Sequence, residues 1–118
     1  MIQGHVTEEV IPIIMLPITT ETWPAVIDTG FNGDLELPVQ LRALVNPRFL
    51  LRERSFLAGG QTIVEDVFLV DFPFDGQTIA AEATFAPGGE ILIGTHFLRQ
   101  YRLTIDFVAR TVVLGRVG

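Results

Sequence analysis

The amino-acid sequence predicts an all-β fold in a single domain. Valine, isoleucine, threonine and phenylalanine are plentiful, and turn residues recur about every eight to twelve positions, a pattern typical of short strands joined by hairpins. At 118 residues the chain has the size of one domain, expected to span residues 1–118. A chain of this length can bury roughly two thirds of its unfolded surface, which is enough for a hydrophobic core.

In the first half of the chain we expect strands at residues 3–6, 10–16, 23–28 and 35–37. Pro12 and Pro17 cannot donate to a sheet ladder, so the second strand is expected at a sheet edge or a bulge. Residues 19–22 and 30–33 are polar or rich in glycine and are predicted to be turns. A proline opens residues 38–44, which are predicted to form a short helix that the following Asn-Pro pair ends.

In the second half we expect strands at residues 49–57, 62–72, 78–85, 91–93, 103–107 and 111–114. Glycines at 58–61 and an Asp-Gly pair within 74–77 predict two hairpin turns. The short strand at 91–93 is wholly apolar, so we expect it to be buried on both faces. Thr95 is expected to cap a C-terminal helix at 96–101.

The composition limits the partners that the protein can bind. Hydrophobic residues make up 48% of the chain, which is high for a small monomer and indicates that a partner covers some apolar surface. Fourteen acidic residues stand against eight basic ones, all arginine, giving a net charge of −6. This balance argues against nucleic-acid binding and against adsorption to anionic membranes.

The chain has no cysteine, which excludes disulfides and thiolate metal sites and fits a reducing compartment. The N-terminal residues lack the basic and apolar regions of a signal peptide. The apolar segment 10–18 contains two prolines and is too short to span a bilayer. We therefore expect a cytoplasmic protein.

The most informative motif is Asp28-Thr29-Gly30, which follows the apolar run 25–27. Glycine permits a tight turn and lets a peptide N–H approach the carboxylate closely. The threonine hydroxyl can hydrogen-bond a backbone group across a subunit interface and lock two such turns together. Asp before Gly is also common in plain turns, so the tripeptide alone does not decide between a functional and a structural role. A second apolar run that ends in glycine, 91–94, favours the functional interpretation.

With these motifs in place, the chain resembles the retropepsin-like family of aspartic proteases, the retroviral proteases and their bacterial relatives. The resemblance covers nearly the whole chain. It rests on Ala25-Val26-Ile27-Asp28-Thr29-Gly30, Leu35-Glu36-Leu37-Pro38, Ala58-Gly59-Gly60-Gln61, Ile91-Leu92-Ile93-Gly94 and Leu103-Thr104-Ile105-Asp106-Phe107. The family implies a small closed β barrel, an obligate homodimer and no cofactor.

The resemblance also implies a role for each matching residue. Asp28 would be the catalytic carboxylate, Thr29 the interlocking hydroxyl and Gly30 the turn. Residues 58–61 would be the tip of a flap that closes over a peptide, for which paired glycines are suited. The substrate-binding residues would be Phe31, Asn32, Ala58, Gly59, Gly60 and Ile93, and no metal would be bound.

Peptide hydrolysis in this family needs two carboxylates that share one proton, so that one acts as acid and the other as base. The chain has one Asp-Thr-Gly, so the second carboxylate is expected from another copy of the chain. The implied activity is therefore that of a homodimeric aspartic endopeptidase whose two Asp28 side chains hold a water at the two-fold axis. The polypeptide substrate would bind as an added strand.

The chain departs from the family pattern in two places. Phe31 replaces a small residue after the glycine, and its ring either narrows the cleft or swings outward. Thr95-His96 replaces the usual arginine-containing pair, so Arg99 or Arg102 is the candidate for the interface brace. These departures favour a second hypothesis, a non-catalytic peptide-binding or dimerisation module with the same fold.

Other polar residues are more simply explained by structure. Asp106 is a candidate second acid, but pairing with a nearby arginine or with backbone amides is the preferred interpretation. Asp34 and Glu36 either shape substrate pockets or lie on a solvated strand face. His96 is expected to pack or cap within its helix, and neither histidine has the neighbours of a metal site. Ser55, the sole serine, lacks a nearby base motif.

Overall fold

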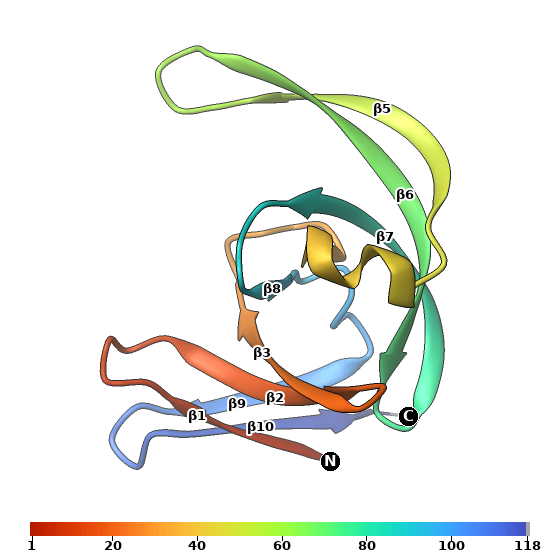
Figure 1. Ribbon diagram of the computed structural model, residues 1–118. Helices are drawn as coiled ribbons and strands as arrows, with labels where there is room; N and C mark the ends of the chain where they lie inside the picture. The colour runs from red at the N-terminus through yellow and green to blue at the C-terminus, as the bar shows by residue number, and fades with distance from the viewer. Residues whose placement is uncertain (118) are drawn as a thin grey trace.

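The computed structural model describes residues 1–117 and contains one ten-stranded sheet (Figure 1). The strands are β1 (Ile2–Val6), β2 (Pro12–Ile18), β3 (Glu21–Ile27), β4 (Leu35–Pro38), β5 (Arg48–Phe56), β6 (Thr62–Phe74), β7 (Gln77–Ala86), β8 (Ile91–Ile93), β9 (Tyr101–Asp106) and β10 (Thr111–Arg116). A 3-10 helix, η1 (Val39–Leu44), follows β4. The all-β prediction is confirmed, and every strand expected from the sequence is present with ends shifted by a few residues.

The strand order is β5-β6-β7-β4-β8-β3-β2-β1-β10-β9. Hairpins account for most neighbours, but β8 lies between β3 and β4, far from both in sequence. It runs parallel to β3, with Ala25 opposite Ile91, and antiparallel to β4, with Leu35 opposite Ile93. Ile91 and Ile93, on one face of β8, are fully buried, whereas Leu92 on the other face is partly buried. The expected burial on both faces is therefore complete on one face only.

The prediction of a closed barrel is wrong. Over residues 1–117 the sheet order begins at β5 and ends at β9, so both are edge strands. The hairpin of β5 and β6 extends away from the rest of the molecule (Figure 1). Nearly all of β5 is exposed on both faces, so no apolar core holds it against β9.

The prediction of a C-terminal helix at 96–101 is also wrong. Residues 95–100 form successive turns, in which the amide of Leu98 donates to Thr95 O and the amide of Tyr101 donates to Leu98 O. The Thr95 hydroxyl donates to Phe31 O at 3.4 Å instead of capping a helix. The turns end at residue 100, because Tyr101 begins β9.

The expected helix after Pro38 is present as the 3-10 helix η1, with Pro38 as its N-cap and Leu41 buried. The expectation for the prolines of β2 is wrong, because β2 lies inside the sheet between β1 and β3. β1 pairs only with residues 12–14 of β2, which leaves Pro17 unpaired on that side. The missing N–H of Pro17 therefore removes no ladder bond to β1.

Aromatic rings fix the turns at 95–100 to the sheet. Phe97 is buried, and its ring meets the ring of Phe74 edge-on at a centroid distance of 4.9 Å and that of Phe72 at 5.8 Å. Tyr101 adds a further edge contact to Phe74 at 5.5 Å. Such pairs contribute about 0.5–1.5 kcal/mol each beyond their buried area, so this cluster holds the segment after β8 firmly.

Candidate active site

The Asp28-Thr29-Gly30 turn leaves the sheet at the end of β3, where backbone hydrogen bonds hold it. The amide of Asp28 donates to Ile93 O of β8 at 3.0 Å. The amide of Gly30 donates to the Asp28 carboxylate at 3.0 Å, the close approach that glycine was expected to permit. Asp28 is half-buried, whereas Thr29 and Gly30 are exposed. The turn therefore presents a fixed carboxylate at the molecular surface.

Gly94 allows the segment after β8 to pack against the loop after Asp28, backbone on backbone. Its amide donates to Asp34 O at 2.9 Å, and the amide of Thr95 donates to Phe31 O at 2.8 Å. A Cβ at position 94 would collide with Gly33 O and would lie 2.7 Å from Phe31 O. The glycine that ends the second apolar run is thus required by the close approach of two loops.

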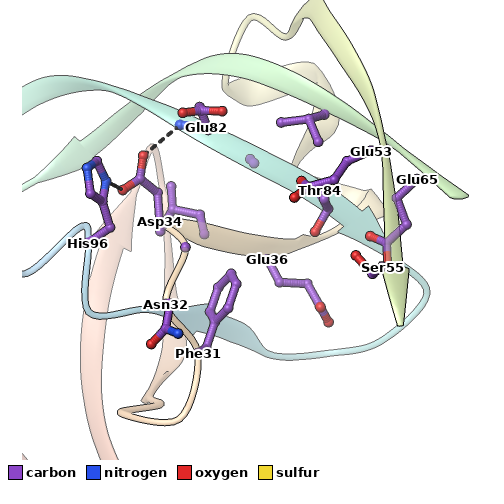
Figure 2. Close-up of a pocket in the computed structure, with 14 residues that line it drawn as sticks. Phe31, Asn32, Asp34, Glu36, Glu53, Ser55, Glu65, Glu82, Thr84 and His96 are labelled. Carbon is purple, nitrogen blue, oxygen red and sulfur yellow. Dashed lines mark hydrogen bonds and ion pairs between the residues drawn. The ribbon is translucent and has the colours of Figure 1, made fainter. Parts of the chain in front are cut away.

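A cleft of about 490 Å³ opens beside this turn, under the β5–β6 hairpin (Figure 2). Its lining comes from the loop after Asp28 and from β4, β5, β6, β7 and the segment after β8. The lining residues are Phe31, Asn32, Gly33, Asp34, Leu35, Glu36, Glu53, Ser55, Glu65, Val67, Glu82, Ala83, Thr84 and His96. Asp28 lies next to this lining, because the amide of Phe31 donates to Asp28 O at 3.1 Å.

The ring of Phe31 lines the cleft, which settles the orientation that the sequence left open. A Cβ at Gly33 would lie 2.7 Å from a carbon of that ring, so Gly33 provides the space that the ring occupies. Phe31 therefore narrows the cleft beside Asp28 and gives it an apolar wall.

Asp34 joins three segments around the cleft and is 8% exposed. One carboxylate oxygen accepts the amide of Glu82 on β7 at 3.0 Å. The other lies 2.5 Å from Nδ1 of His96 (Figure 2). Arg99 donates to His96 O at 2.8 Å, which further orders the segment after β8. A buried carboxylate with two such partners positions the loop that carries Asp28.

The sequence does not predict the pairing of Asp34 with His96. It left Asp34 either in a pocket wall, where the structure places it, or on a solvated strand face, and it indicated a helix around His96. The two residues are 62 positions apart, and no local pattern marks them as partners. The only local signal for Asp34 is its place in the short loop, residues 28–34, that directly follows a buried strand and begins with Asp28.

Glu36 lies between the hairpin and the Asp28 turn. Burial raises the pKa of its carboxyl above the usual range, and the negative charges of Glu65 and then Asp28 raise it further. The negative charges of the hairpin and of the Asp28 turn therefore both act on Glu36.

The structure separates the predicted substrate-binding residues into three groups. Phe31 and Asn32 line the cleft. Ile93 is fully buried and supports the Asp28 turn through its carbonyl. Ala58, Gly59 and Gly60 are exposed in the loop between β5 and β6, where Gly59 and Gly60 have φ of 93° and 84°. These left-handed values suit glycine, but the binding role of all three groups remains a prediction.

Asp106 has a structural role in the turn between β9 and β10. Its carboxylate accepts the amides of Val108 and Ala109, which is one of the pairings expected from the sequence.

Within residues 1–117 no group of three or more His, Asp or Glu side chains is arranged to hold a metal ion. No helix in the same range is long and apolar enough to cross a membrane.

Comparison with known proteins defines the fold. No protein-family model and no curated protein matches the chain. Among solved structures, the chain is similar to a retropepsin-like aspartic protease from Rickettsia conorii, with a TM-score of 0.69 and 16% sequence identity. The match covers 96% of this chain and 88% of that one.

This similarity extends over almost the entire chain, so the molecule has a retropepsin-like fold. The resemblance inferred from the short motifs is confirmed at the level of fold. At 16% identity this similarity establishes the fold alone.

Proposed function

We propose that the protein is an aspartic endopeptidase that acts as a homodimer, with one Asp28 carboxylate from each subunit. The observation that carries this proposal is the position of Asp28. It stands on a rigid surface turn beside a cleft, in a chain with a retropepsin-like fold. Two such carboxylates would hold one water, and the shared proton would let one act as base and the other as acid.

The exposure of Thr29 and Gly30 supports the dimeric arrangement, because these residues are available to a second copy of the turn. The position of the cleft beneath the β5–β6 hairpin supports the binding of an extended polypeptide (Figure 2). Such a peptide would add a strand and would contact Ser55 and Val67, which line the cleft from the hairpin. The exposed Phe56 and Val64 alternate to the outer face of the hairpin and would not be covered by this peptide.

The first experiment is cleavage of a peptide library between about pH 3 and 8, a range chosen around carboxylate titration. We expect cleavage that pepstatin inhibits and that Asp28→Asn lowers by at least about a thousandfold. Cleavage that survives Asp28→Asn would refute the catalytic assignment. A wild-type protein that binds peptides but cleaves none would instead be a non-catalytic binding module.

A mixing experiment tests the shared site directly. When equal amounts of wild-type and Asp28→Asn chains exchange subunits, about one quarter of the dimers are fully wild-type. The activity of the mixture should then fall to about half that of the same wild-type amount alone, because mixed dimers hold one carboxylate. An unchanged activity would show that a single chain is sufficient.

A further inference from the structure

The cleft carries an excess of negative charge that the protein does not neutralise. Its acidic lining residues are Asp34, Glu36, Glu53, Glu65 and Glu82, and its one basic lining residue is His96. His96 is already paired with Asp34. Within residues 1–117 the other ion pairs join Arg48 to Asp71 and Arg52 to Asp66, so none involves Glu36, Glu53 or Glu65.

The β5–β6 hairpin separates its charges between two faces. Glu53 and Glu65 are directly opposite each other in the strand register, and both line the cleft. Like charges opposite each other destabilise a sheet. The adjacent pair, Arg52 and Asp66, alternates to the outer face and forms an ion pair at 2.9 Å. Of the charged side chains in this part of the hairpin, only the acidic Glu53 and Glu65 therefore line the cleft, and the neighbouring Arg52 points away from it.

Glu36 extends this negative surface from the hairpin toward the Asp28 turn. It projects from β4, and the side chain of Glu65 points toward it across the cleft (Figure 2). The carboxylates come from separate strands and line one side of the cleft of about 490 Å³. Repulsion between these negative charges is relieved when a cation binds between them.

We propose that the cleft selects polypeptides with an arginine or lysine side chain close to the scissile bond, and that Glu36, Glu53 and Glu65 bind its charged group. The inference rests on the proposed function and specifies its substrate class. A guanidinium or ammonium group in the cleft donates charge-assisted hydrogen bonds to carboxylates of both the hairpin and β4. The aliphatic part of the same side chain packs against Phe31, which supplies the apolar wall.

The test begins with the cleavage sites found in a peptide library. We expect arginine and lysine to be enriched within a few residues of the cleaved bond. Each strongly cleaved arginine peptide is then compared with a peptide that contains citrulline, which has nearly the same shape and no charge. The value of kcat/KM should be about tenfold higher for arginine, and the difference should shrink at high salt. Equal enrichment of charged and neutral residues would overturn the inference and leave the peptidase proposal standing.

Two variants locate the preference in the cleft. In the double variant Glu53→Gln and Glu65→Gln, the arginine-to-citrulline ratio should fall to near one. Asp66→Asn is the matched control, because it removes one negative charge from the outer face of the same hairpin and should keep the ratio. Urea unfolding should show that the double variant is at least as stable as the wild type, since a repulsive pair is removed. If the double variant keeps the wild-type arginine-to-citrulline ratio, Glu53 and Glu65 do not bind the cationic side chain and the inference is wrong.

A binding measurement separates failure of this inference from failure of the proposed function. Capped fluorescent octapeptides with one arginine, and their citrulline counterparts, are titrated with the Asp28→Asn protein. Fluorescence anisotropy should give a dissociation constant about tenfold lower for the arginine peptides. If the wild-type protein cleaves no peptide, this difference in the dissociation constant would still support cation selection, by a protein that binds peptides without cleaving them. Equal dissociation constants would overturn it.

Discussion

Replacing Gly94 by alanine should displace the Asp28 turn without touching any charged group. The added Cβ would meet Gly33 O and lie 2.7 Å from Phe31 O, and both atoms belong to the backbone of the Asp28 loop. Neither contact can be relieved by the rotation of a side chain. The loops must therefore separate, which stretches the hydrogen bonds from Gly94 N to Asp34 O and from Thr95 N to Phe31 O.

The expected cost follows from these contacts. Overpacking of a buried position costs about 1–3 kcal/mol. Each weakened backbone bond costs roughly 0.5–1.5 kcal/mol more, so the free energy of unfolding should fall by about 2–6 kcal/mol. This is a large fraction of the roughly 5–15 kcal/mol that stabilises an ordinary domain. Because the turn that carries Asp28 moves, peptide cleavage should fall by about a hundredfold or more.

Urea unfolding at a fixed protein concentration measures the stability change, and a peptide assay measures the activity. Gly89→Ala is the matched control, since a Cβ at this position meets nothing within 4 Å. The control should stay within about 0.5 kcal/mol of the wild type. A Gly94→Ala protein with wild-type stability and activity would refute the conclusion that these backbones must touch.

Three further predictions follow from particular side chains. Because folding raises the pKa of Glu36, the ionised carboxylate opposes folding. In urea unfolding, Glu36→Gln should therefore raise the free energy of unfolding at neutral pH, and this gain should vanish in acid, where Glu36 of the wild type is protonated. The hydrogen bond from Arg48 lowers the pKa of Asp71 in the folded protein, so the ionised carboxylate stabilises the fold at neutral pH. This stabilisation is lost as the pH falls through the pKa of Asp71 in the folded state. In urea unfolding, Asp71→Asn should therefore be less stable than the wild type at neutral pH, and the difference should disappear in acid. Phe97→Ala should cost about 3–5 kcal/mol in urea unfolding, and the exposed Phe107→Ala should cost less than about 0.5 kcal/mol.

The strands could be predicted because each is encoded by local features. Apolar residues bounded by turn residues located β8 within Ile91–Ile93, and glycine or Asp-Gly pairs located the hairpins. The closed barrel came from the family resemblance alone. Whether β5 meets β9 depends on tertiary contacts of the projecting hairpin, which no residue pattern within either strand records.

The candidate site shows the same division between local and distant information. Asp28 and its glycine turn were recognisable because three adjacent residues carry the motif. The partnership of Asp34 with His96 was not recognisable, since it arises when the segment after β8 turns back beside the loop after β3. The helix expected at 96–101 is absent because the hydroxyl of Thr95, the expected cap, donates to Phe31 O and the chain enters β9 at Tyr101.

The insertion of β8 between β3 and β4 has a consequence for biosynthesis. As the chain leaves the ribosome from its N-terminus, the residues around Asp28 emerge long before Ile91–Ile93, which complete their support. Pairings of such distant segments form late in folding, because a long loop must close first. A nascent chain that ends before β8 therefore lacks the backbone support of the Asp28 turn, and the proposed peptidase stays inert until β8 has emerged.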